Sequence, residues 1–281
     1  MNLPETLRYR SIDDYFRMDY DSRKGYFTME RFHMHQCYEV YYLFSGERGY
    51  FIKDRTYTIR EGDLILINSN EVHKSLEVGV PNHDRVVMYY EDIFFKRYYP
   101  DEAAFLLSPF QESRVLRLNM KERFHIEELY RSFFKELLEK EPGYELRLRH
   151  LAAELLILSN RIAKNKQDIV EKTSPTQRKI KEIVQYINDC YKKPIRLNDT
   201  AKQFYISPSH LSRIFKESTG FTFTDYINLV RIREAQRLLR ETDWSITKIS
   251  EETGFDNFSH FGKIFKKISN MSPREYRRHY K

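Results

Sequence analysis

The sequence of 281 residues has only two cysteines, Cys37 and Cys190, and contains no long apolar run. Two cysteines do not make the disulfide framework of a small secreted domain, so we expect a reducing compartment. No apolar stretch approaches the roughly 18–20 residues of a membrane-spanning helix, and the N-terminus lacks the apolar segment of a secretory signal peptide. These absences predict a cytoplasmic protein that has no membrane partner.

Positive charge is concentrated in the C-terminal part of the chain. Residues 175–281 contain 21 Lys and Arg against 12 Asp and Glu, a net of +9, whereas residues 1–174 contain 27 against 29, a net of −2. The length suits two domains. A near-neutral half followed by a basic half is typical of a sensor joined to a module that binds a polyanion. Charge alone leaves three alternatives open for the basic half: it binds nucleic acid, it binds a membrane surface, or it binds neither.

Residues 26–90 have the pattern of a β-rich domain. Short segments rich in β-branched and aromatic residues alternate with turn sequences such as Ser45-Gly46 and Glu61-Gly62-Asp63. The predicted strands are 40–44, 50–52, 57–59, 64–67 and 86–90. Regular short strands with tight turns indicate a sandwich or barrel, so we expect an all-β fold here.

From about Lys121 the apolar residues recur with the period of a helix. Two amphipathic helices are predicted, with apolar positions at Phe124, Leu129, Phe133 and Leu137 in the first and at Leu148, Leu151, Leu155 and Leu158 in the second. They form either a dimer face or a layer packed on the β-domain alone. Residues 164–175 are polar and without pattern, which predicts a linker between a domain of residues 1–163 and an all-α domain of residues 176–281.

The last hundred residues contain one pattern twice. Leu211-Ser212-Arg213-Ile214-Phe215-Lys216 returns fifty positions later as Phe261-Gly262-Lys263-Ile264-Phe265-Lys266. Upstream the offset is forty-nine, since Ala201 matches Ser250 and Ile206 matches Phe255. The difference of one residue falls in the turn between two short helices, where an insertion is tolerated. We therefore predict two helix-turn-helix units, at about 197–218 and 246–268, joined by a helix at about 224–240.

Each copy carries helix caps around its second helix. Ser207 followed by Pro208 predicts an N-cap in the first copy, and Asp256 or Asn257 does so in the second. Gly220 and Asn270 suit the positive φ at which helices often end.

The first copy predicts a surface that reads DNA. Leu211, Ile214 and Phe215 lie on one face at i, i+3 and i+4, which leaves the opposite side to Ser209, Ser212, Arg213 and Lys216. The N-terminal half of a recognition helix meets base edges in this way. Arg213 suits the O6 and N7 atoms of guanine, and Lys216 suits phosphate.

The second copy carries a longer pattern: Ile249-Ser250-(x)3-Gly254-Phe255-(x)3-Ser259-His260-Phe261-(x)3-Phe265-Lys266-Lys267-(x)4-Ser272-Pro273-(x)2-Tyr276-Arg277. It resembles the signature of the AraC/XylS family of bacterial transcription regulators, and the resemblance extends over about Gln177 to Arg278. Ser250 and Asn270 depart from the family's usual Ala and Gly. Gly262 offers no side chain, which weakens base reading at that position.

The resemblance implies a sequence-specific transcription regulator and not an enzyme. Two recognition helices would enter successive major-groove segments on one face of a double-stranded DNA operator. The implied DNA-binding residues are Ser209, His210, Ser212, Arg213, Lys216, Ser259, His260, Gly262, Lys263 and Lys266. It further implies a homodimer, a small-molecule effector such as a sugar, and activation of transcription with RNA polymerase as a partner.

A second resemblance lies in the N-terminal half. His33-x-His35-(x)3-Glu39-(x)6-Gly46, followed by Gly62-(x)5-Asn68-(x)4-His73, resembles the two cupin motifs. On a strand, offsets of two and six place His33, His35 and Glu39 on one face. The resemblance implies a cupin-like barrel, or double-stranded β-helix, before the two helices. The departure is Asn68-x-Asn70, which stands where Pro-x-Gly is usual.

Several interpretations of this set remain open. His33, His35, Glu39, Tyr41 and His73 contact an effector, with no cofactor required. Alternatively, all of these except Tyr41 hold a divalent metal in the pocket, as the matching residues do in metal-binding cupins. A third interpretation is a metal-dependent cupin enzyme fused to a DNA-binding domain, and a fourth is a barrel that serves oligomerisation alone. The first is favoured.

Two neighbouring features also have two interpretations each. Cys37 is either a further soft metal ligand or a small buried thiol, and the thiol is favoured. Residues 9–17 are either an arm that closes over a ligand, as in the resembled family, or a strand or loop packed on the barrel.

Overall fold

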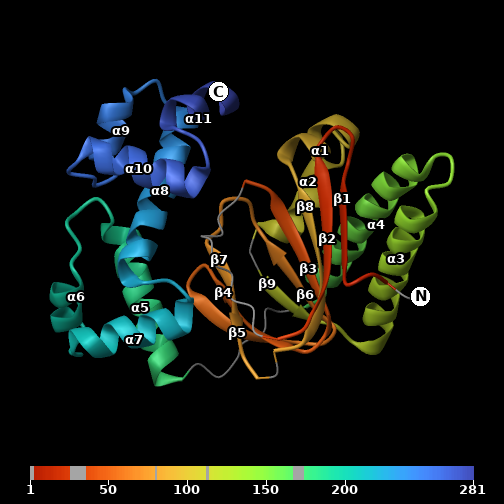
Figure 1. The fold of residues 1–281 in the computed structure, drawn as a ribbon, viewed down its shortest axis with the longest axis horizontal. Coiled ribbons are helices and arrows are strands. Elements are labelled where there is room, and N and C mark those ends of the chain that lie inside the picture. The colour runs from red at the N-terminus through yellow and green to blue at the C-terminus, as the bar shows by residue number, and fades with distance from the viewer. Residues whose placement is uncertain (1–2, 26–35, 80, 112–113, 167–173) are drawn as a thin grey trace. The chain divides into compact units, whose positions relative to one another are not determined.

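The computed structural model describes residues 3–25, 36–79, 81–111, 114–166 and 174–281. Most residues up to Glu171 form one compact unit, and residues 172–281 make up most of a second. Within this described part, all strands lie between Thr6 and Arg117, and residues 174–281 form helices and turns (Figure 1). The predicted two-domain class, β-rich and then all-α, is confirmed.

Two antiparallel sheets form the centre of the N-terminal unit. One has six strands in the order β1-β2-β8-β3-β6-β9, and the other has three in the order β5-β4-β7. The strands are β1 (Thr6–Arg10), β2 (Phe16–Arg23), β3 (Tyr38–Ser45), β4 (Glu47–Ile52), β5 (Arg55–Arg60), β6 (Asp63–Ile67), β7 (His73–Glu77), β8 (His83–Tyr90) and β9 (Arg114–Arg117). Alternate residues of both sheets meet in one buried cluster that includes Tyr41, Tyr50 and Ile59, so the sheets pack face to face.

Helices cover the other face of the six-stranded sheet. They are α1 (Asp92–Tyr98), α2 (Ala103–Leu107), the 3-10 turn η1 (Ser108–Phe110), α3 (Met120–Glu139) and α4 (Tyr144–Lys164). Figure 1 shows α3 and α4 side by side along the sheet, on the side away from β4, β5 and β7. Strand residues such as Tyr42 and helix residues such as Tyr130 and Leu155 share one apolar core. The leucine stripe of α4 therefore packs on the sheet.

One predicted core position of α3 is wrong. Phe124 is 57% exposed, whereas Ile126, Tyr130 and Phe133 are fully buried. The buried face of α3 is centred about half a turn away from Phe124, because the neighbouring sheet lies on that side.

Four strands were not among those predicted, namely β1, β2, β7 and β9. Residues 9–17 belong largely to β1 and β2 and the turn between them, at one edge of the six-stranded sheet. Phe16 is 2% exposed, in the core between sheet and helices. Of the two interpretations of this segment, the strand packed on the β-domain is the one observed.

The C-terminal unit contains two helix pairs joined by one long helix. Its helices are α5 (Pro175–Cys190), α6 (Leu197–Gln203), α7 (Pro208–Thr219), α8 (Phe223–Glu241), α9 (Ile246–Glu252), α10 (Phe258–Ser269) and α11 (Pro273–Tyr280). The pairs are α6 with α7 and α9 with α10, and α8 connects them. The predicted core positions of α8 are all buried: Ile227, Val230, Ala235, Leu238 and Leu239.

Arg231 fastens α8 to its surroundings. Its guanidinium donates to the carbonyl oxygens of Tyr191 at 2.9 Å and Lys193 at 3.0 Å, in the segment after α5. The same group lies over the ring of Phe255, 5.6 Å from the centroid, in the turn of the second helix pair. One side chain of the connecting helix thus contacts both halves of this unit.

Candidate nucleic-acid interface and effector site

The two helix pairs turn in the same way. In the first, the amide of Ile206 donates to the carbonyl of Ala201 at 3.0 Å. In the second, the amide of Phe255 donates to the carbonyl of Ser250 at 3.1 Å. Ala201 and Ser250 are both buried, as their small side chains allow where two helices cross closely. The offset of forty-nine in the sequence therefore corresponds to an equivalent backbone.

The residue between these positions differs in the two copies. Tyr205 has φ of 56° and its side chain is 93% exposed. Gly254, at the matching place, has φ of 82°. A Cβ atom on Gly254 would lie 2.6 Å from the carbonyl oxygen of Tyr191, so only glycine fits without displacement of the backbone. The first turn is open to solvent and the second is closed by the chain.

The recognition helix of the first copy, α7, is capped at both ends as predicted. The Ser207 hydroxyl accepts from the amide of His210 at 3.2 Å, Pro208 follows, and Gly220 ends the helix with φ of 75°. Leu211 and Phe215 are fully buried. The predicted outward side chains are all exposed, and they are Ser209, His210, Ser212, Arg213 and Lys216.

Arg213 is held within its own helix. Its guanidinium contacts the carboxylate of Glu217 at 3.2 Å and the Nδ1 atom of His210 at 3.2 Å. The Arg213–Glu217 pair is exposed, and such i,i+4 pairs contribute only about 0.3–0.5 kcal/mol. Arg213 is therefore oriented by its neighbours yet readily available to an external acceptor.

The second recognition helix, α10, repeats this design. Asn257 provides the cap, because its Oδ1 accepts from the amide of His260 at 2.8 Å, and Asn270 ends the helix with φ of 57°. Phe261 and Phe265 are buried. The predicted side chains Ser259, His260, Lys263 and Lys266 are exposed.

Gly262 lies in the first half of α10, on its outer side. A Cβ atom there would meet no atom within 4 Å, so packing within the chain does not require glycine. Glycine inside a helix costs roughly 0.5–1 kcal/mol relative to alanine. Gly262 therefore lowers the stability of the helix and leaves the backbone on its outer surface without a side chain.

The N-terminal unit buries a polar pair between its two sheets. The Nε2 atom of His73 lies 3.3 Å from Oε2 of Glu39, and the hydroxyl of Tyr50 donates to Oε1 of Glu39 at 3.0 Å. Glu39 and His73 are at most 2% exposed. Burial acts to lower the pKa of His73, but the Glu39 carboxylate raises it, and the net pKa is above the usual value. The structure thus brings together the two parts of the cupin-like pattern.

Other members of the predicted set lie elsewhere. His33 and His35 are outside the described residues, so the full metal set stays a prediction. Within the described ranges, no group of three or more His, Cys, Asp or Glu is placed to hold a metal ion. Tyr41 is 1% exposed and lies in the same buried layer as Tyr50.

Cys37 is the small buried thiol that was favoured. It is 4% exposed, and its Sγ atom donates to Oε1 of Glu91 at 2.8 Å. Burial and the Glu91 carboxylate raise the pKa of the thiol well above its usual value. Because metals bind the thiolate, this environment disfavours Cys37 as a ligand.

Residues 22–156 match the family model of an AraC-like ligand binding domain, and residues 200–279 match that of a helix-turn-helix domain. The chain belongs to the AraC family. It is therefore a DNA-binding transcription regulator with a ligand-binding domain, as the sequence predicts. None of the helices in the described part has the length and hydropathy to cross a membrane.

Relatives of this AraC-family regulator span most of its length. The uncharacterized HTH-type transcriptional regulator YfiF of Bacillus subtilis is 25% identical over 89% of this chain and 79% of its own. The HTH-type transcriptional activator RhaR of Mannheimia succiniciproducens is 24% identical over 87% and 86%. The solved structure of ToxT from Vibrio cholerae is 16% identical, covers 95% of this chain and 99% of that chain, and has a TM-score of 0.40.

Sequence reasoning missed the basic part of the ligand-binding domain's interior. Arg48 and Arg85 are buried between the sheets at 1% and 9% exposure, and Asp21 lies beside Arg85. A signal was present, since Arg17, Asp19, Asp21 and Arg23 alternate along β2 with period two. Because charged residues are mostly exposed, such a stripe is expected to face the solvent.

Proposed function

We propose that the regulator binds operator DNA with α7 and α10 in successive major-groove segments. The observation that carries this proposal is the duplicated recognition helix, in which caps, core and turn repeat and the basic side chains of both copies are exposed. Arg213 reads a guanine in the first segment. Lys216 and Lys266 neutralise phosphates. The two copies present different side chains, so the preferred site is asymmetric.

A binding experiment tests this arrangement. High-affinity sites are first selected from random duplexes with the wild-type chain, and affinities are then measured by fluorescence anisotropy at several salt concentrations. Arg213→Ala weakens the selected site by about 1–3 kcal/mol and relaxes preference at one base step. Lys266→Ala weakens all duplexes alike and reduces the slope of log K against log salt by about one. Lys121→Ala, in the N-terminal unit, is the control. Wild-type affinity in both test variants would show that the docking is wrong.

The N-terminal unit, we infer, is the sensor. Its match to a ligand binding domain and the buried Glu39–His73 pair between its sheets support an effector site there. Ligand binding would shift the balance between arrangements of the DNA-binding domains, and RNA polymerase would respond at activated promoters. The ligand is bound and not converted, so a ligand that stabilises the protein should be recovered unchanged. Because its proposed partner is DNA, we expect the protein in the cytoplasm.

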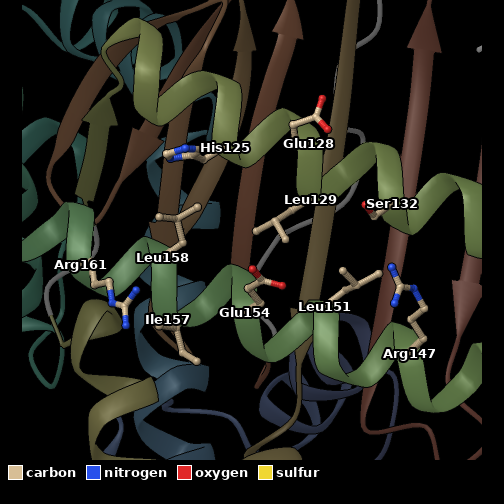
Figure 2. A pocket seen from close by; sticks show the side chains of 10 residues that line it. All are labelled: His125, Glu128, Leu129, Ser132, Arg147, Leu151, Glu154, Ile157, Leu158 and Arg161. Carbon is tan, nitrogen blue, oxygen red and sulfur yellow. The ribbon is translucent and has the colours of Figure 1, made fainter.

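We also propose that the regulator is a homodimer that pairs through α3 and α4. A groove of about 460 Å³ lies between these helices on their outer side. Figure 2 shows Glu128 and Glu154 near its middle, with Arg161 towards one end and Arg147 towards the other. Charges of both signs on one surface suit a two-fold interface, in which each patch meets a copy of itself.

Light scattering on the purified chain tests the dimer. Glu154→Arg places a third arginine in the groove and should shift the mass from dimer towards monomer. Glu141→Arg makes the same charge change outside the groove and should leave the mass unaltered. A monomeric wild type, or equal dimerisation of both variants, would contradict this interface.

A further inference from the structure

The second recognition helix begins with an exposed aromatic residue. Phe258 is the first residue of α10 and is 52% exposed. Among the large apolar side chains that are exposed within residues 174–281, it is the one that lies on α7 or α10. The matching residue of α7, fifty positions earlier, is Pro208, which is common at the first helical position. The start of the helix therefore does not require phenylalanine, and the two copies differ at this point.

The ring of Phe258 is packed against the core of the second helix pair. Its centroid lies 6.2 Å from that of Phe261, with 35° between the ring planes. Phe261 is fully buried and packs in turn on Phe255 and Phe265, at centroid distances of 5.2 and 5.6 Å. Because a phenylalanine side chain has few rotatable bonds, contact with this fixed neighbour restrains the ring before any partner binds. Phe258 is thus both exposed and held in place.

Gly262 leaves this ring uncovered on the outer side of the helix. Side chains four residues apart on a helix are neighbours, and the later one leans back over the earlier one. The residue four positions after Phe258 is Gly262. A Cβ atom there would meet no atom within 4 Å, those of the Phe258 ring included. Beside the ring there is therefore room for a group that comes from outside the chain.

The polar residues of α10 leave one kind of base feature unread. Ser259, Lys263 and Lys266 are exposed hydrogen-bond donors, which suit base or phosphate oxygen and nitrogen atoms. Thymine differs from the other bases in the major groove by its 5-methyl group, which no donor recognises. Phenylalanine is one of the side chains that contact this methyl group in protein–DNA complexes. An exposed ring on a recognition helix therefore suits thymine.

We propose that Phe258 determines specificity by packing its ring on the 5-methyl group of a thymine in the DNA segment that α10 contacts. The N-terminal end of a recognition helix is the part that meets base edges, and Phe258 is the first residue of α10. Gly262 leaves the space that the methyl-bearing edge of the base occupies. The inference rests on the proposed docking of α7 and α10 and adds one base preference to it. Because the contact is apolar, the preference does not depend on salt.

Replacement of thymine by deoxyuridine tests the methyl contact, because uracil lacks the 5-methyl group and keeps every hydrogen-bonding atom. The full-length wild-type chain is titrated by fluorescence anisotropy against its selected site, with each thymine of the α10 segment replaced in turn. The α10 segment is the one whose base preference Arg213→Ala leaves unchanged. We expect one replacement to weaken binding by about fourfold, the usual contribution of one buried methyl group, and by the same factor at every salt concentration.

Phe258→Ala assigns the methyl contact to its side chain. This variant should bind the thymine site about fourfold or more weakly than wild type, and it should bind thymine and uracil sites alike. A ring that serves only the core would instead weaken both sites by one factor and leave the discrimination intact. Tyr280→Ala removes an exposed ring outside both recognition helices and should discriminate as wild type does.

The outcomes separate this inference from the proposed docking. Selected sites without thymine in the α10 segment, equal binding of wild type to every uracil site, or unchanged discrimination in Phe258→Ala would each overturn the role of Phe258. If Arg213→Ala still weakens the selected site in that case, the docking stands and this inference alone fails. If Arg213→Ala and Lys266→Ala both bind as wild type, the docking itself is wrong.

Discussion

The turn of the second helix pair offers the sharpest test of how this fold is built. Gly254→Ala adds one methyl group at a residue with φ of 82°, where the new Cβ would lie 2.6 Å from the Tyr191 oxygen and 2.9 Å from that of Lys192. Tyr205→Gly is the opposite change at the matching residue of the first pair, where φ is 56° and the side chain is exposed. The two variants should shift stability in opposite directions.

The expected magnitudes follow from two contributions. A residue with a Cβ in the left-handed region costs roughly 1–2 kcal/mol. Forcing an extra carbon against fixed backbone atoms costs about 1–3 kcal/mol more. Gly254→Ala should therefore lower the free energy of unfolding by about 2–5 kcal/mol. Tyr205→Gly relieves only the first contribution, and the flexibility of glycine in the unfolded chain offsets part of it, so a gain of about 0–1 kcal/mol is expected.

Urea unfolding followed by Trp244 fluorescence measures both effects, because this single tryptophan lies in the same unit as both turns. Tyr205→Ala retains the left-handed strain and serves as the control, with a change within about 0.5 kcal/mol. A loss below about 1 kcal/mol in Gly254→Ala would refute the close approach to Tyr191. A decrease of about 1 kcal/mol or more in the free energy of unfolding of Tyr205→Gly would refute the claim that this turn is strained.

Four further predictions concern single groups. Glu39→Ala leaves His73 without its buried partner and should lower the unfolding free energy of the N-terminal unit by about 3–5 kcal/mol, measured by calorimetry. The pKa of His73 in the folded protein is above the usual 6.5, so its contribution to stability is present below pH 6.5 and is lost as the pH rises through the folded pKa. The difference in unfolding free energy between wild type and His73→Ala should therefore decrease over that pH range. Burial and nearby arginines lower the pKa of His83. Its contribution to stability should therefore be present above pH 6.5 and be lost as the pH falls through the folded pKa. Asn257→Ala removes the α10 cap and should cost about 1 kcal/mol in urea unfolding, whereas Asp256→Ala should cost little.

The helical half could be predicted from the sequence because its determinants are local. The caps Ser207 and Asn257 act within one turn, and the apolar positions of α7 and α10 recur with the helical period. Both signals need only a few neighbouring residues. Duplication then removes most ambiguity, since a chance pattern rarely returns with its caps in phase.

The sheets were predicted less completely because their stability comes from distant partners. His73 to Glu77 has little intrinsic preference for a strand, and it becomes one because it pairs with β4. From the sequence alone, Asp21 is expected on the surface, and only its position opposite Arg85 in the sheet explains its burial. The contact of Glu39 with His73 was foreseeable from motif spacing, but the arginines around Tyr41 belong to no motif and needed the fold.

The length of α8 has a consequence for the DNA. Its 19 residues span about 28 Å at 1.5 Å per residue, and Arg231 joins it to the segment after α5 and to the turn of the second helix pair, so we expect a fixed interval between the two recognition helices. In the proposed complex, one base pair inserted between the two contacted segments moves the second by about 3.4 Å and rotates it by about 35°. A substitution costs one contact, whereas an insertion misplaces a whole helix. Operators of this regulator should therefore vary more in base sequence than in the spacing between the two contacted segments.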